Sequence, residues 1–187
     1  NNQDHIEEAP VFMTWCADFS RLNRVCQHQG YELEAGYVEN FLVAAVDCGI
    51  AMQNAGLAAE SLGLGFCYIG AIRNNPREII DLFDLPRFVF PIAGMTLGWP
   101  TKPPRIRPRL PVEAVLHWEL YDQDDREYLE DYDQAMIESG IYRGRQVKGD
   151  RVAENRYGWM EHSARRVSSP VRTHLKEVIK EAGFSLK

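Results

Sequence analysis

The sequence predicts an α+β domain, and three observations carry that prediction. Apolar runs rich in β-branched and aromatic residues, such as 10–19 and 88–97, are typical of strands. Residues 34–62 form one long segment that is apolar around most of its circumference, as a buried helix is. The C-terminal part, 122–187, has helical signals separated by polar linkers. We therefore expect a central mixed or antiparallel sheet, flanked by helices around one long buried interface helix.

The chain is expected to begin with a strand and a short helix. Residues 10–19 are almost continuously apolar, which predicts a buried strand. Residues 20–29 predict a short helix, because Ser20 is available to cap its start and Gly30 to end it.

The segment 34–62 predicts the longest helix of the chain. Its polar side chains recur every seven residues and so form one narrow stripe along the helix: Asn40, Asp47, Asn54 and Ser61. Nearly every other position is apolar, so the helix must be buried on several sides. The simplest cover is the same helix of a second subunit, and the alternative is a core helix buried within one chain.

Two more strands are expected after the long helix. Residues 66–70 predict a short strand bounded by glycines, and Asn75 is then expected to cap a helix. Residues 88–97 predict another strand. Pro91 and Gly94 favour an edge or irregular position for that strand, because proline cannot donate to a sheet ladder.

The rest of the chain is expected to be mainly helical. A short strand at 112–118 precedes an acidic helix at 122–139, which Gly140 ends. A polar linker, 144–150, leads to the last helix at 170–182. We expect a single domain over 1–187, with 122–187 as its helical C-terminal excursion.

Composition narrows the function classes. The chain has 187 residues, of which 45% are hydrophobic, so it is long enough to bury a core. A net charge of −6 disfavours a basic nucleic-acid-binding face. The start of the chain lacks the features of a signal peptide, and no uninterrupted apolar run reaches the roughly 18 residues of a membrane span. We expect a cytoplasmic protein with no membrane or nucleic-acid partner.

The cysteines predict neither a metal site nor a disulfide framework. They lie at positions 16, 26, 48 and 67, without a C-x-x-C pair or matching histidines. The five histidines have no carboxylate or serine at motif spacing. Free cytosolic thiols are the default interpretation, and we assign no catalytic histidine.

The proline- and arginine-rich segment 103–111 is the strongest local signal for a binding site. Its prolines favour a stiff, extended backbone. Arg107 and Arg109 are two residues apart and so point to the same side. Guanidinium groups suit phosphate, since each donates two parallel hydrogen bonds. A solvated basic loop is the alternative.

Four motifs together resemble one family. They occur in order along essentially the whole chain: NAGLAAESLGLG at 54–65, YIGAIRNNP at 68–76, GMTLGWP at 94–100 and RPRLP at 107–111. The chain resembles the FMN-dependent nitroreductase superfamily, and within it the NADPH-preferring branch of oxygen-insensitive nitroreductases and flavin reductases. The resemblance implies a nitroreductase-like fold.

The resemblance also implies a cofactor and a reaction. It implies a homodimer with FMN at the subunit interface, and a ping-pong cycle in which NADPH reduces the flavin and a nitroaromatic, a quinone or free flavin reoxidises it. Arg107 and Arg109 match the family's positions on the FMN phosphate. The backbone beside the flavin ring matches Tyr68, Ile69, Gly70 and Ala71, where Ala71 replaces the usual second glycine. The flavin carries the chemistry, so no side chain is assigned as catalytic.

Two further arginines match positions that the branch uses toward the NADPH phosphates. These are Arg73, close after residues 68–71 (called the flavin turn below), and Arg143, close after the acidic helix. From the residues alone, Arg73 reads as a surface charge and Arg143 as a partner for an acidic side chain of the same chain.

One departure from the family bears on the function. The family opens with a helix that carries an Arg/His-Ser-x-Arg motif and supplies the rest of the phosphate site, and no such motif precedes Asn1. We expect that a segment of the family fold is missing or that the cofactor site is incomplete. The rival function is a non-catalytic flavin- or nucleotide-binding protein or a degenerate dimerisation module.

Overall fold

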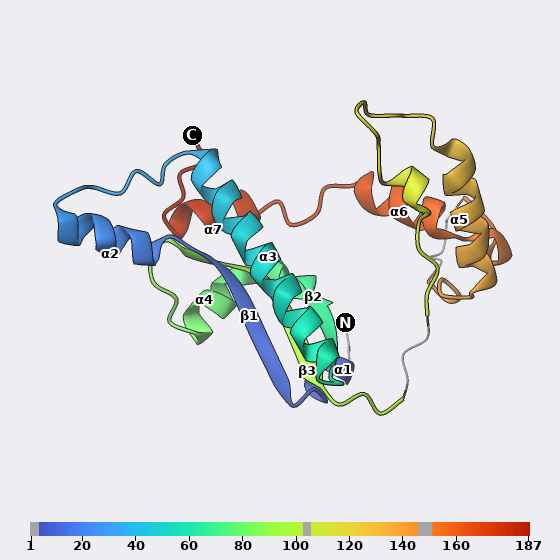
Figure 1. Cartoon of the computed structure of the whole chain (residues 1–187), viewed down its shortest axis with the longest axis horizontal. Coiled ribbons are helices and arrows are strands. Elements are labelled where there is room, and N and C mark those ends of the chain that lie inside the picture. The colour runs from blue at the N-terminus through green and yellow to red at the C-terminus, as the bar shows by residue number, and fades with distance from the viewer. Residues whose placement is uncertain (1–3, 103–105, 146–150) are drawn as a thin grey trace. The chain divides into compact units, whose positions relative to one another are not determined.

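The computed structural model describes residues 4–102, 106–145 and 151–187 (Figure 1). These residues form two compact units. The sheet unit comprises residues 1–103 together with 172–187, and the helical unit comprises 104–171. The single-domain organisation expected for 1–187 stays a prediction.

The sheet unit is built on a three-stranded antiparallel sheet. The strands are β1 (Val11–Asp18), β2 (Gly65–Ile69) and β3 (Val89–Gly98), in the spatial order β1-β3-β2. The predicted strands at 10–19, 66–70 and 88–97 are confirmed to within one residue at each end, as is the α+β class with an antiparallel sheet.

Of the two placements expected for 88–97, the edge position is wrong, because β3 lies at the centre of the sheet. The irregular stretch is confirmed, because the register between β1 and β3 shifts within it. Pro91 lies opposite Cys16, where the register between β1 and β3 shifts after Trp15. A bulge interrupts the ladder, so a residue without an N–H is accommodated there. Gly94 is required by close packing, since a Cβ at this position would lie 2.3 Å from the Phe12 ring.

The long helix is α3 (Val38–Ser61), which runs along the sheet and packs on β1 and β2 (Figure 1). Its inward face carries small buried residues, namely Ala44, Cys48, Gly56 and Ala59. Gly56 allows close approach to β2, because an added Cβ would lie 2.7 Å from the Phe66 ring and 2.9 Å from the Tyr68 hydroxyl. The other residues of α3 are exposed or half-buried in the single chain, and Leu42 and Ile50 are 55% and 58% exposed.

The hydropathy of α3 is high for a helix of its length. Among the described residues, α3 is a helix long and apolar enough to cross a membrane by length and composition alone, with a mean hydropathy of 1.4. The sequence expectation concerned an uninterrupted apolar run, and the polar stripe of Asn40, Asp47, Asn54 and Ser61 does interrupt α3. Long core helices of water-soluble proteins meet the same criterion, so one such helix is weak evidence for a membrane span.

The core of the sheet unit is aromatic and is completed by the C-terminal segment. Phe184 is fully buried after α7 (Leu175–Glu181). Its ring meets the rings of Phe19, Phe41 and Phe88 edge-on, at centroid distances of 6.2, 5.3 and 6.1 Å. Such pairs contribute beyond the area they bury. The last predicted helix, 170–182, is confirmed in a shorter form as α7.

The capping residues predicted for the shorter helices of the sheet unit are confirmed only in part. They are α1 (Asp4–Glu7), α2 (Ser20–Gln29), the 3₁₀ turn η1 (Gly70–Asn74) and α4 (Pro76–Leu82). Gly30 ends α2 in the left-handed conformation, with φ of 79°. Ser20 does not cap it; instead the Asp18 carboxylate accepts a 2.7 Å hydrogen bond from the Ser20 N–H. Asn75 precedes α4 without a side-chain cap.

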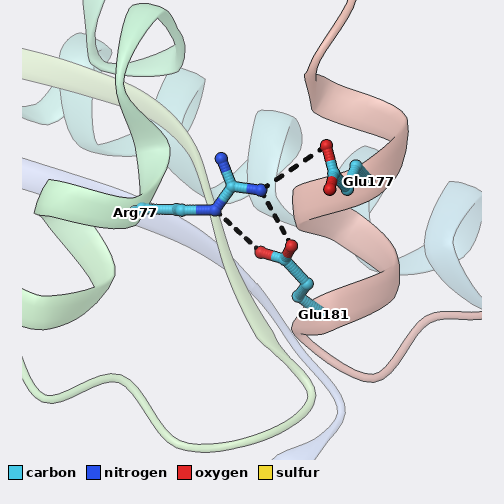
Figure 2. A network of polar contacts seen from close by, with 3 residues as sticks. All are labelled: Arg77, Glu177 and Glu181. Carbon is cyan, nitrogen blue, oxygen red and sulfur yellow. Dashed lines mark hydrogen bonds and ion pairs between the residues drawn. The ribbon is translucent and has the colours of Figure 1, made fainter.

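An ion-pair network links α4 to α7 (Figure 2). Arg77 donates from Nε and Nη2 to the two carboxylate oxygens of Glu181, at 2.9 and 2.8 Å. Its Nη2 lies 3.6 Å from Glu177. The hydrogen bond from Arg77 lowers the pKa of Glu181. These groups are solvent-exposed, so the network orients the two helices more than it stabilises them.

The helical unit contains the 3₁₀ turns η2 (Val112–Ala114) and η3 (Glu154–Arg156) and the helices α5 (Arg126–Glu138) and α6 (Trp159–Val167). The helix predicted at 122–139 is confirmed as α5, and Gly140 follows it with φ of 68°. The strand predicted at 112–118 is wrong. A strand needs a neighbour to pair with, and the described part of this unit holds none. Of the predicted linker 144–150, residues 146–150 lie outside the described residues.

The helix α6 has no counterpart among the predicted elements, because its cap comes from another helix. The Asp133 carboxylate on α5 accepts a 2.7 Å hydrogen bond from the Met160 N–H in the first turn of α6. Gly158 precedes α6 and leaves room for this carboxylate, since a Cβ there would lie 2.3 Å from Asp133 Oδ1. A side-chain acceptor at a helix start satisfies an otherwise free N–H group.

Candidate functional site

The end of β2 and the start of η1 form the first part of the site. Ile69 is buried at the end of the strand, and Gly70 opens η1, followed by the half-buried Ala71. Tyr68 directs its side chain toward α3, where its hydroxyl donates a 2.8 Å hydrogen bond to Gln53 Oε1. Burial, and secondarily the carboxylate of Glu60, raise the pKa of Tyr68. At this turn the groups that remain to contact a ligand are therefore backbone groups rather than the Tyr68 hydroxyl.

Arg73 is tied to the same turn. Its Nη1 donates to the carbonyl oxygen of Ile92, next to the bulge of β3. Its Nη2 lies 3.2 Å from where a Cβ on Gly70 would sit, so the guanidinium packs against the glycine. Burial lowers the pKa of Arg73, and the nearby charge of Arg172 lowers it further. Arg73 is thus half-buried rather than a free surface charge.

The arginines of the proline-rich segment lie in the helical unit. Arg107 and Arg109 are exposed on a stretch without regular structure, and Pro111 at its end has the extended values φ −62° and ψ 157°. Among the described residues, Arg109 Nη1 contacts the carbonyl oxygen of Pro108 at 3.5 Å and makes no shorter hydrogen bond. Neither guanidinium forms an ion pair with a carboxylate among the described residues. Both are available to an external anion.

Arg143 lies apart from these arginines along the helical unit, at the rim of a cavity of about 620 Å³. Tyr142, Glu154, Asn155 and Tyr157 also line this cavity. Arg143 is exposed and makes no ion pair with a described carboxylate, so the interpretation as an intramolecular pair is not supported. Glu154 is engaged elsewhere, accepting a 3.0 Å hydrogen bond from the Gly144 N–H.

Tyr157, which lines this cavity, belongs to a part-buried polar cluster that the sequence analysis missed. Arg165 Nε donates to the hydroxyl of the buried Tyr157 at 3.0 Å, and the same hydroxyl lies 3.2 Å from His162 Nδ1. The His162 ring stacks near that of Tyr142, at 4.7 Å. His162 and Arg165 lie on α6, so a prediction of that helix would have placed them on one side of it.

The two halves of the chain match two profiles of one family. The nitroreductase family matches residues 1–99, and the C-terminal domain of the nitroreductase family matches residues 107–187. The chain belongs to the nitroreductase family. The boundary between the two matches lies close to the first division between the structural units near residue 103, whereas residues 172–187 of the C-terminal match belong to the sheet unit.

Relatives of this nitroreductase-family chain resemble it over nearly its whole length. An oxygen-insensitive NADPH nitroreductase of Salmonella typhimurium is 36% identical over 99% of the chain and 72% of the relative. An FMN reductase [NAD(P)H] of Bacillus subtilis is 37% identical over 99% and 73%. The solved structure of B. megaterium NfrA2 is 34% identical, with a TM-score of 0.89, over 100% of this chain and 74% of that one. The nitroreductase-like fold is thereby confirmed.

One thiol of the chain lies next to the site, because Cys67 directly precedes Tyr68 and its Sγ lies 3.8 Å from the Tyr68 carbonyl oxygen. All four cysteines are free, and burial raises the pKa of Cys16 to about 11, which keeps that thiol un-ionised at neutral pH. Within the described ranges, no group of three or more histidine, cysteine or acidic side chains is placed to hold a metal ion.

Proposed function

We propose that this protein is an FMN-dependent NAD(P)H oxidoreductase that reduces nitroaromatics, quinones or free flavin in a ping-pong cycle. The observation that carries the proposal is the match to nitroreductases and flavin reductases along nearly the entire chain. FMN, when bound, would supply the hydride chemistry between the nicotinamide coenzyme and the acceptor.

The residues of this chain fit FMN. The flavin ring needs backbone close to its edge, and the turn from Tyr68 to Ala71 provides it at Gly70, which carries no side chain. A backbone N–H here would favour negative charge on the reduced ring. The FMN phosphate needs cationic donors, and Arg107 and Arg109 are two guanidinium groups without a described carboxylate partner.

The remaining residues bind and orient the coenzyme. We assign Arg143, at the rim of its cavity, to the phosphate that distinguishes NADPH from NADH, and Arg73 to the coenzyme side of the flavin turn. Hydride transfer requires proximity and stacking rather than an acid–base pair. The protein therefore acts by positioning its two substrates in turn.

Arg143→Ala is expected to raise the KM for NADPH about tenfold or more, because a charge-assisted hydrogen bond is lost. The kcat and the flavin content should change little, as they do when uniform binding is removed. Steady-state kinetics with NADPH and with NADH measure the effect, and NADH turnover should barely change. Arg145→Ala, at the neighbouring cation that stacks on Tyr142, is the matched control. Equal loss with both coenzymes, or loss of FMN, would contradict the assignment.

The exposed face of α3 leads us to propose a homodimer. Large apolar side chains are solvent-exposed along it in the single chain: Val38, Leu42, Val43, Val46, Ile50 and Leu57. Burying this face in an obligate interface should cover more than about 2,000 Å². Sedimentation at micromolar concentration should show a dimer, and Ile50→Glu should dissociate it while Glu39→Gln does not. A monomeric parent protein would refute the proposal.

A visible spectrum of the purified protein tests the function as a whole. Yellow protein that NADPH bleaches without oxygen supports the oxidoreductase. Yellow protein that no nicotinamide coenzyme bleaches supports the rival flavin-binding protein, and colourless protein that takes up no added FMN contradicts both. We place the enzyme in the cytoplasm, a compartment that keeps its four free thiols reduced.

A further inference from the structure

A cavity of about 380 Å³ lies in the sheet unit, between α4, α7 and the loop that joins α4 to β3. Four aliphatic side chains contribute to its wall: Val89 and Val178 are buried, and Ile80 and Leu85 are half-buried. Sites for small molecules are commonly apolar clefts of roughly 300–1,000 Å³ with a few polar groups. The cavity is at the small end of this range, so it suits a small ligand with an aliphatic part. No residue of its wall is among those assigned above to FMN or to the coenzyme.

The loop side of the cavity is held in one conformation by strained and hydrogen-bonded backbone. Asp84 and Phe88 have left-handed φ values of 46° and 67°, which are unfavourable for residues with a Cβ. The Leu85 N–H donates a 2.9 Å hydrogen bond to the Ile80 carbonyl oxygen on α4. The Phe88 N–H donates to the Ala182 carbonyl oxygen at the end of α7, at 2.6 Å. A wall that is fixed in advance lowers the ordering cost of binding a ligand.

Four charged side chains line the cavity, and two of them neutralise each other. Arg77 and Glu181 form the two-bond contact drawn in Figure 2, at 2.9 and 2.8 Å. The other two, Asp81 and Arg87, form no ion pair with any described residue. The Arg87 guanidinium lies over the Phe88 ring, 4.7 Å from its centroid, and can still pair with a carboxylate. The cavity therefore presents one anion and one cation to a ligand, beside an aliphatic wall.

We propose that this cavity binds a small aliphatic zwitterion, an amino acid of the leucine type. The ammonium group of the ligand would pair with Asp81 and its carboxylate with Arg87, while its branched side chain would cover Val89 and Val178. A monocarboxylate would satisfy Arg87 but bring a like charge into the same cavity as Asp81, and a simple amine would do the reverse. The proposal uses none of the residues assigned to the flavin, so it does not rest on the proposed function.

Titration calorimetry of the purified protein with leucine and its truncated analogues tests the site. Leucine should bind. Isocaproate, which lacks the ammonium group, and isopentylamine, which lacks the carboxylate, should each bind about tenfold or more weakly. Glycine, which lacks the side chain, should also bind more weakly than leucine. No binding of leucine at roughly millimolar concentration, or equal affinity for any of the three analogues, would overturn the proposal.

Variants then assign each charge of the cavity to one group of the ligand. Arg87→Gln should weaken leucine binding about tenfold and remove the preference for leucine over isopentylamine, because the contact with the carboxylate is then lost for leucine as well. Asp81→Asn should likewise remove the preference for leucine over isocaproate. A preference for leucine over isopentylamine that survives Arg87→Gln would overturn the proposal.

The matched controls remove the same charges from positions outside the cavity. Glu78→Gln on α4 and Lys180→Gln on α7 should bind leucine like the parent. Asp81 and Arg87 are exposed, as are both control residues, so all four variants should melt close to the parent temperature. Weakening in the controls equal to that in the cavity variants would refute the site. Leucine binding is measured without turnover, so it fails or holds independently of any oxidoreductase activity.

Discussion

Replacing Phe184 with alanine should lower the free energy of unfolding of the sheet unit by about 3–5 kcal/mol. The side chain is fully buried and meets three other phenylalanine rings, so its removal leaves a cavity lined by Phe19, Phe41 and Phe88. Urea unfolding followed by circular dichroism measures the change.

A matched control exists on the same unit. Phe83 is 49% exposed, and Phe83→Ala should cost much less than Phe184→Ala. Phe184→Leu, which fills part of the cavity, should fall between the two. Equal losses for Phe83→Ala and Phe184→Ala would mean that the ring cluster is not the main core of the unit.

Removing Arg109 should have the second largest effect, on the cofactor rather than on the fold. Arg109→Ala loses one member of a charge-assisted contact with the FMN phosphate, so FMN should dissociate about tenfold or more readily. The side chain is exposed and, among the described residues, makes only one weak contact, so stability should not change. The fluorescence of released flavin gives the dissociation constant.

The double variant Arg107→Ala/Arg109→Ala sharpens this test. Both guanidinium groups are proposed to donate to the same phosphate, so their joint loss should exceed either single loss. Arg21→Ala removes an equal charge on α2 and should retain flavin. If Arg109→Ala holds FMN as tightly as the parent, the segment is the solvated basic loop of the alternative interpretation.

The sheet and the long helix could be predicted because their signals are local. Apolar runs mark β1, β2 and α3, and glycines mark the ends of β2 and the end of α3, without reference to the rest of the chain. The position of β3 could not be derived in this way. Pro91 alone favours an edge strand, and only the register shift opposite Trp15 and Cys16 explains a proline at the centre of the sheet.

The helical unit was harder to predict because its start and stop signals come from distant residues. The carboxylate at the start of α6 is supplied by Asp133, 27 positions before Met160 in the sequence. The segment 112–118 has strand composition, but strand formation depends on a pairing partner. Propensity alone carries no information about that partner.

Those parts of the candidate site that lie within one local sequence motif could be proposed from the sequence. Arg107, Arg109 and the turn at Gly70 were assigned by resemblance to a family, and their roles remain predictions. Arg172 could not be associated with Arg73 from the sequence, because nearly a hundred residues separate them. Its hydrogen bond to Asn74 is visible only in the folded chain.

The return of residues 172–187 to the sheet unit has a consequence for protein synthesis. The ribosome makes the strands and α3 first, then the whole helical unit, and only afterwards Phe184. At the usual 5–20 residues per second, the sheet unit waits roughly 4–16 s for the ring that completes its core. During that interval Phe41 and Phe90 lack the cover that Phe184 and α7 provide. The nascent chain is therefore expected to be a client of ribosome-associated chaperones during this interval.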